Sequence, residues 1–142
     1  MNIATIDDFD KVWGIFQDNK EWFPHVWNTK IKKRIANGEV VFENDVVITY
    51  SIYKRNNKIE NLTALKNECI LHQIVAKYRN GSARKTIEDF FKFVNTPVWL
   101  TVRSENITAC NFYKKVGMRE VGKTSWSNGN IQGLIYKKEL NL

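Results

Sequence analysis

The stretch Asn-Ile-Thr-Ala-Cys-Asn-Phe-Tyr-Lys-Lys-Val-Gly-Met, residues Asn106 to Met118, follows the apolar run Val98 to Val102. Its asparagine, alanine and aromatic residues recur at helical spacing, and Gly117 stands where a helix often takes a left-handed residue at its C-terminus. We therefore expect a strand followed by a capped helix. The residues at the fixed positions of this pattern are Asn106, Ala109, Phe112, Tyr113, Gly117 and Met118.

These positions also match a known signature. The spacing Asn-x-x-Ala-x-x-aromatic-Tyr-x-x-x-Gly-Met resembles the second acyl-CoA motif of the GNAT acetyltransferases. An ordinary amphipathic helix capped by glycine, with Phe112 in the core and Tyr113 at its edge, would show part of the same pattern. The order of elements along the rest of the chain distinguishes the two interpretations.

A chain of 142 residues with 43% hydrophobic content can bury one core, which predicts a single globular domain over residues 1–142. No apolar run approaches the ~20 residues of a membrane span, and Met1 to Asp10 carries acids where a signal peptide would be basic and apolar. We therefore expect a cytoplasmic protein without membrane contact. Cys69 and Cys110 match neither a metal-ligand spacing nor a disulfide framework, so no metal site is expected.

The charge of the chain favours anionic partners. Lysine and arginine outnumber aspartate and glutamate by 22 to 15, which gives a net charge of +7. The diphosphate of CoA is one such partner, and a nucleic acid is another. One basic cluster supports the second idea, although a solvated helix face would also explain it. This cluster consists of Lys30, Lys32, Lys33 and Arg34.

Hydrophobic periodicity and turn signals predict the secondary structure. The polar segment 54–67 is expected to be a loop, and Asn44-Asp45 and Asn128-Gly129 mark hairpins, the latter with a two-residue turn. The predicted strands are residues 2–6, 39–43, 46–53, 68–75, 98–102, 121–126 and 131–138, and the predicted helices begin at Asp7 or Asp8, cover 29–36 and 82–94, and begin again at Asn106.

This order of strand, two helices, three strands, helix, strand, helix and two strands resembles the GNAT fold along the whole chain. The resemblance implies an α/β (α+β) fold whose mixed, mostly antiparallel sheet has six to seven strands and is flanked by four helices. It also implies acetyl-CoA as the acyl donor and a homodimer as a common assembly.

The segment between the strand at 68–75 and the helix at 82–94 has the geometry that offers free backbone amides and a positive helix end to a phosphate. The GNAT signature for this loop is Arg or Gln-x-x-Gly-x-Gly or Ala. Tyr78 departs from its first position, and Arg79 follows one residue later. The resemblance implies that the donor contacts Arg79, Asn80, Gly81, Ser82, Ala83 and Arg84, the backbone of Ile74 and Val75, and the second motif at Asn106, Ala109 and Phe112.

Acetyl transfer to an amine needs a proton for the departing thiolate and a neutral nucleophile. The resemblance implies that Tyr113 is the acid, because its phenol is protonated at neutral pH; a tyrosine at the edge of the core is the alternative. His72 and Glu68 are candidates for the base because both are polar residues in an apolar strand. His72 ranks ahead of Glu68, because Glu68 lies at the start of the strand, where water can solvate it. Proximity alone, without a base, can also suffice for an amine of low pKa.

The acceptor is expected to enter over the first two helices and the last hairpin. Aromatic side chains beside a basic helix can stack bases, and they can equally pack as core. Gln73 lies on the opposite face of its strand from Glu68 and His72. The residues assigned to the acceptor are Trp22, Phe23, His25, Trp27, Gln73 and Trp126.

The sequence therefore predicts an acetyl-CoA-dependent N-acetyltransferase that acetylates a primary amine by direct attack. The acceptor class stays open between a nucleic-acid-linked amine, such as a modified base or charged tRNA, and a small or protein amine. A competing hypothesis is a catalytically inactive basic binding module that acts as a nucleic-acid or protein adaptor. The departure at Tyr78 is the feature that favours this second class.

Overall fold

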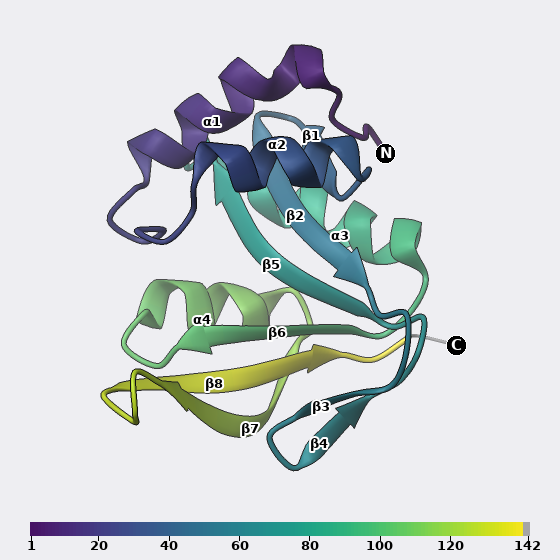
Figure 1. Ribbon diagram of the computed structural model, residues 1–142, viewed down its shortest axis with the longest axis vertical. Helices are drawn as coiled ribbons and strands as arrows, with labels where there is room; N and C mark the ends of the chain where they lie inside the picture. The colour runs from purple at the N-terminus through teal and green to yellow at the C-terminus, as the bar shows by residue number, and fades with distance from the viewer. Residues whose placement is uncertain (141–142) are drawn as a thin grey trace. The chain divides into compact units, whose positions relative to one another are not determined.

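The computed structural model describes residues 1–140. Helices and strands follow one another much as the sequence predicts (Figure 1). In chain order, the elements are a 3₁₀ helix η1 (Ile6–Asp8), α1 (Phe9–Asp18), α2 (Asn28–Ala36), β1 (Val40–Glu43), β2 (Val46–Ile52), β3 (Asn57–Ile59), β4 (Leu62–Ala64), β5 (Cys69–Ala76), α3 (Ser82–Val94), β6 (Val98–Arg103), α4 (Ile107–Lys115), β7 (Arg119–Trp126) and β8 (Ile131–Lys138).

Six strands form one mixed sheet in the order β1-β2-β5-β6-β8-β7, and β3 and β4 form a separate two-stranded sheet. The β5–β6 pair is parallel, whereas β1–β2, β6–β8 and β7–β8 are antiparallel. The predicted α/β fold with a mixed sheet and four α-helices is therefore confirmed. The chain divides into two compact units, which are described in turn. The single-domain organisation stays a prediction.

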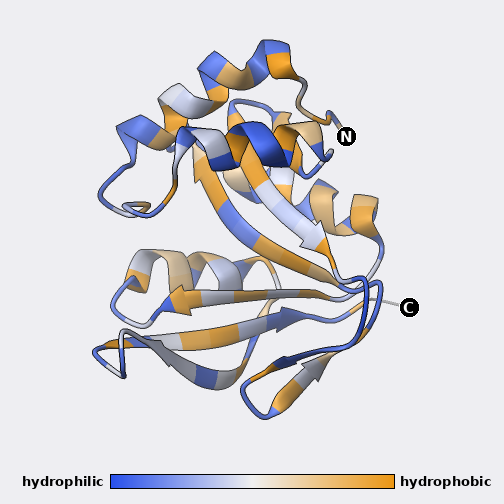
Figure 2. Ribbon diagram, viewed as in Figure 1, coloured by the Kyte–Doolittle hydropathy of each residue, from blue (hydrophilic) through white to orange (hydrophobic). Residues whose placement is uncertain are grey.

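The first unit comprises Met1–Tyr50 and Gln73–Phe90, and its core lies under α1 and α2. Hydrophobic and hydrophilic residues alternate along both helices at helical spacing (Figure 2), so each helix buries one stripe. Burying an aliphatic or aromatic side chain contributes about 1.5–3 kcal/mol, so this stripe stabilises the unit. The buried core residues are Ala4, Phe9, Val12, Ile15, Phe16, Ile31, Ile35, Val40, Val47 and Val75.

The β1–β2 hairpin turns at Asn44 and Asp45, whose φ angles of 56° and 58° are left-handed as in a type I′ turn. The predicted hairpin is therefore confirmed. The strand predicted at residues 2–6 is wrong, because only Ile3 forms a bridge, to Val41. The Asp8 carboxylate accepts a hydrogen bond from the Thr5 amide at 2.9 Å, which starts a 3₁₀ turn before a strand can extend.

The second unit comprises Ser51–His72 and the chain from Phe91 onward. Its strands β6 and β8 pair Leu100 with Tyr136, and the Tyr113 ring of α4 lies 6.0 Å from the Tyr136 ring. Because neighbouring residues of a strand point to opposite faces, Trp99 lies on the face away from α4. There it packs with Ala64, Ile135 and the partly buried Tyr53, Ile59, Leu62, Ile70 and Val121.

The β3–β4 hairpin corrects the prediction that residues 54–67 form a loop. Each strand has only three residues, which is too short for periodicity to reveal. Tertiary packing supports the hairpin instead. Leu62 Cδ1 lies 3.2 Å from where a Cβ on Gly122 would stand, and Thr124 Oγ1 donates to Glu60 Oε1 at 2.8 Å. A Cβ at position 122 would crowd the side chains of Leu62 and Ile135.

The hairpin predicted between the last two strands is confirmed, with Trp126 paired to Ile131. Its turn spans Ser127 to Asn130, the link that the predicted strands leave between them, rather than the Asn128-Gly129 pair alone. Ser127, Asn128 and Gly129 all have positive φ angles, so the left-handed region extends over three residues. In the part of the chain that the structure describes, no helix combines the length and the apolar character needed to cross a bilayer.

Two glycines make a matched test of backbone conformation. Gly117 follows α4 with φ of 92°, whereas Gly14 lies inside α1 with open space around its missing Cβ. Gly117→Ala is expected to lower the free energy of unfolding by about 1 kcal/mol or more, because alanine is strained at positive φ. Gly14→Ala should raise it by about 0.8–1 kcal/mol, the difference in helix propensity. Urea denaturation measures both, and changes of the same sign would contradict this assignment.

Candidate functional site

The loop that follows β5 in the first unit leads directly into α3. Gly81 has φ of 86°, and a Cβ there would meet nothing within 4 Å. Asn80 Oδ1 accepts a hydrogen bond from the Ser82 amide at 3.1 Å, and the Lys85 amide donates to Gly81 O at 3.4 Å. These bonds fix the start of α3 at Ser82, as predicted.

Several backbone N–H groups of this loop have no hydrogen-bond acceptor in the protein. Within residues 1–140, these are the N–H groups of residues 78–81, 83 and 84. Arg84 and Lys85 form exposed ion pairs with Glu88 and Asp89, at 3.0 and 3.3 Å, whereas Arg79 has no carboxylate partner in the same described range. Tyr78 is 52% exposed. Open amides at a helix N-terminus beside a free guanidinium can bind an anion such as a diphosphate.

The second unit carries the other motif. Asn106 is the N-cap of α4, and its Oδ1 accepts a hydrogen bond from the Ala109 amide at 3.2 Å. At the other end, Gly117 donates to Lys114 O at 3.1 Å and Met118 donates to Tyr113 O at 3.0 Å. Capping at both ends thus explains the asparagine and the glycine of the motif.

Tyr113 is buried, with 8% of its surface exposed. Its ring lies 5.7 Å from that of Phe112 and 6.0 Å from that of Tyr136. Burial, and then the nearby Cys110 thiol, raise the pKa of the Tyr113 phenol, so the phenol keeps its proton throughout the neutral range. Burial also raises the pKa of Tyr136 to about 12.

Strand β5 contributes His72 to the second unit. His72 Nε2 lies 3.0 Å from Ser51 Oγ, which orients the imidazole ring. The parallel ladder with β6 consists of the pairs Cys69–Val98 and Ile70–Trp99 and ends after Ile70 within the described residues. His72 is therefore a half-buried titratable group just beyond the end of a ladder.

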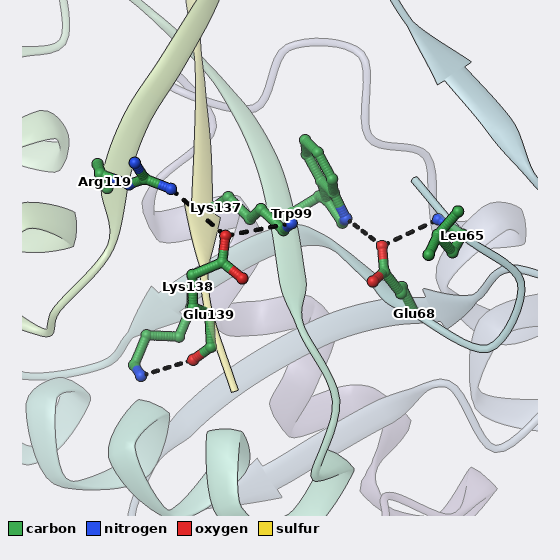
Figure 3. A network of polar contacts seen from close by, with 7 residues as sticks. All are labelled: Leu65, Glu68, Trp99, Arg119, Lys137, Lys138 and Glu139. Carbon is green, nitrogen blue, oxygen red and sulfur yellow. Dashed lines mark hydrogen bonds and ion pairs between the residues drawn. The ribbon is translucent and has the colours of Figure 1, made fainter. Parts of the chain in front are cut away.

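Glu68 has a structural role in the same unit (Figure 3). Its Oε1 accepts hydrogen bonds from Trp99 Nε1 and from the Leu65 amide, both at 2.9 Å, and the residue is only 9% exposed. Lys137 Nζ lies 4.7 Å from the Trp99 ring centroid and pairs with Glu139 at 3.2 Å. The Glu68 carboxylate thus ties the segment before β5 to the sheet.

The remaining predicted residues of β5 belong to the first unit. Gln73 Oε1 accepts a hydrogen bond from Thr49 Oγ1. The Thr49 residue has no exposed surface. Val75 is 6% exposed and packs in the core under α1 and α2, whereas Ile74 is half-buried. The Val75 side chain is therefore part of the core, so a ligand contact at Val75 would fall on its backbone.

The residues predicted for the acceptor divide into two kinds. Phe23 packs on Phe16 with ring centroids 5.5 Å apart, so it belongs to the core. Exposed surface is found instead on Trp22, His25 and Trp27. In the second unit, Trp126 lies against Gly133, where a Cβ would come within 2.5 Å of the indole carbons.

A scan against protein-family models and a search of curated proteins found no match. Solved structures do match. A GNAT-family acetyltransferase from Streptococcus agalactiae has a TM-score of 0.77 at 15% identity, over 99% of this chain and 95% of its own. The ribosomal-protein-S18-alanine N-acetyltransferase of Escherichia coli has a TM-score of 0.68 at 14% identity, over 99% and 93%. The chain has the GNAT fold. A structure of the NatC complex bound to Gag peptide and CoA matches with a TM-score of 0.70 at 13% identity, over 99% and 96%.

The GNAT fold implied by the order of elements is thereby confirmed. The roles of individual site residues stay predictions. Sequence reasoning missed three hydrogen-bond partners, Thr49 of Gln73, Ser51 of His72 and Trp99 of Glu68. Thr49 and Ser51 are polar residues in a strand whose neighbours are apolar, and such residues need partners when they are buried. The alternation of polar and apolar residues in this strand is the sequence feature that could have predicted buried hydrogen-bond partners.

Proposed function

We propose that this protein is an acetyl-CoA-dependent N-acetyltransferase that acetylates a primary amine by direct attack. The open amides of the loop before α3 carry the proposal. Six backbone donors, the positive end of a helix of 13 residues and the unpaired Arg79 form an anion-binding segment that suits a diphosphate. Tyr78 stands in the signature position without blocking it, because its side chain points to solvent beside Lys77.

The reaction joins the amine nitrogen to the acetyl carbon and breaks the bond between that carbon and sulfur. Acetyl-CoA supplies the activated acetyl group. We assign the proton given to the departing sulfur to Tyr113, whose phenol stays protonated because burial raises its pKa. The attacking nitrogen loses a proton, and we assign the acceptance of this proton to the imidazole of His72, whose Nε2 lies 3.0 Å from Ser51 Oγ. Glu68 is a weaker candidate for the base, because Trp99 and Leu65 already occupy its carboxylate.

The acceptor class is less constrained. Two proteins with similar folds are an enzyme named for an alanine of a ribosomal protein and a complex bound to a peptide. These neighbours favour a peptide amine over the nucleic-acid-linked amine that the charge of +7 suggests. A screen with short peptides bearing free N-termini, polyamines and charged tRNA would separate the classes by the release of CoA.

Calorimetric titration with acetyl-CoA, with CoA for comparison, tests the proposal. We expect saturable micromolar binding and a loss of about 10-fold or more in affinity for Arg79→Glu, since one charge-assisted contact of about 1.5–3 kcal/mol is removed. The matched control is Arg55→Glu, because Arg55 is an exposed arginine of the second unit with no ion pair in the described chain. Absence of binding to either ligand at millimolar concentration, or equal losses in both variants, would refute the proposal.

A further inference from the structure

The segment between α1 and α2 exposes large aromatic side chains. Trp22 is 48% exposed and Trp27 is 68% exposed, whereas Phe23 between them packs on Phe16. Tryptophan is highly buried on average, so two exposed indoles in one short link suggest a binding function. Trp27 is fixed at the start of α2, where its carbonyl oxygen accepts from the amides of Lys30 and Ile31, each at 3.1 Å.

Helix α2 adds positive charge next to these rings. It contains four cations and no acid. Ile31 and Ile35 are buried, so Lys30 and Lys33, three residues apart, share the outer face. Neither lysine has an ion pair in the described part of the chain. The other two cations of α2 are committed, since Arg34 pairs with Glu39 at 3.7 Å and Lys32 lies 4.8 Å from the Phe9 ring centroid.

Exposed aromatic faces with unpaired lysines match the chemistry of single-stranded nucleic acid. Bases stack on aromatic side chains, and lysines contact the phosphates between them. A duplex offers the phosphates but keeps its base faces stacked on one another. A membrane surface would require a continuous aliphatic face, whereas the isoleucine side chains of α2 are buried in the core.

We propose that Trp22, Trp27, Lys30 and Lys33 form a binding surface for single-stranded RNA, here called the aromatic–basic surface. The surface lies within the first unit alone. Its binding needs no acetyl-CoA and does not depend on the function proposed above. Binding and acetyl transfer can therefore be measured separately.

The test is fluorescence anisotropy of a labelled oligouridine RNA of about 20 nucleotides, long enough for the sites of such proteins. We expect saturable binding at low salt. Trp27→Ala should weaken it by about 10-fold, because one base stack is lost. Lys30→Glu with Lys33→Glu should reduce the slope of log K against log salt by about 1.4, two phosphate contacts at about 0.7 each.

The matched control is the double variant Lys54→Glu and Lys66→Glu, which makes the same charge change on exposed lysines of the second unit. It should leave the salt slope of RNA binding nearly unchanged. Equal losses in both double variants would mean a general effect of charge and would overturn the proposal. So would absence of RNA binding, equal affinity for a duplex of the same length, or Trp27-dependent binding to phosphatidylglycerol vesicles without binding to RNA.

Discussion

Replacing Tyr113 by phenylalanine is expected to lower kcat by about 100-fold and to leave the Kd for acetyl-CoA unchanged. General acid catalysis contributes about 100- to 10,000-fold, and phenylalanine removes only the hydroxyl group that carries the proton required by the proposed mechanism. The ring itself stays packed against Phe112 and Tyr136, so the fold should be preserved. Thiol release measures kcat once an acceptor is found, and calorimetry measures Kd.

Tyr136→Phe is the matched control, because it removes the same oxygen from the neighbouring ring. The Oη atom of Tyr136 is buried near the Cys110 thiol, and no role in the reaction is assigned to it. Its kcat should match that of the unmodified protein. Because burial raises the pKa of Tyr113, no decline in kcat from loss of this proton is expected as pH rises from neutral toward 10. Equal loss of kcat in both variants would contradict the assignment of the acid.

Glu68→Ala is expected to lower the free energy of unfolding by about 2–4 kcal/mol. The substitution leaves Trp99 Nε1 and the Leu65 amide without their acceptor, and each lost bond to a charged group is worth about 1.5–3 kcal/mol. Some relaxation at the more exposed Leu65 reduces the sum. Urea denaturation measures the change.

Two comparisons separate the structural role of Glu68 from a catalytic one. Glu88→Ala removes an exposed ion pair and should cost only about 0.3–0.5 kcal/mol. Glu68→Gln keeps an acceptor oxygen for Trp99, so it should destabilise less than alanine and retain most of kcat. A variant Glu68→Gln that is fully stable but has lost turnover would show instead that the carboxylate acts as the base.

The parts of the fold that could be predicted from the sequence are those with local signals. Helix α3 was predicted with its observed bounds, because its apolar stripe and the preceding glycine are both local features. The type I′ turn at Asn44 and Asp45 likewise depends on the two residues that adopt it. In both places, the residues that determine the conformation are neighbours in the chain.

The parts that could not be predicted depend on distant residues. The β3–β4 hairpin packs against residues about 60 positions later in the chain: Leu62 lies beside Gly122, and Glu60 accepts a hydrogen bond from Thr124. Glu68 resembled a catalytic carboxylate because its position in an apolar strand was visible, whereas its partner Trp99 was not. The second motif is similar: Asn106 and Gly117 are explained by capping α4, so the pattern alone does not separate a ligand contact from a structural cap.

Gly133 of β8 leaves room for the side chain of Trp126, a residue of β7. The indole of Trp126 occupies the space in which a methyl group on residue 133 would stand. Alanine at this position would force the indole ring to move away from β8. The substitution changes neither the Trp126 residue itself nor the charge of the surface. The orientation of Trp126 can thus be changed independently of its chemistry. If acceptors bind through this indole, a substitution at position 133 would alter their binding by moving the ring.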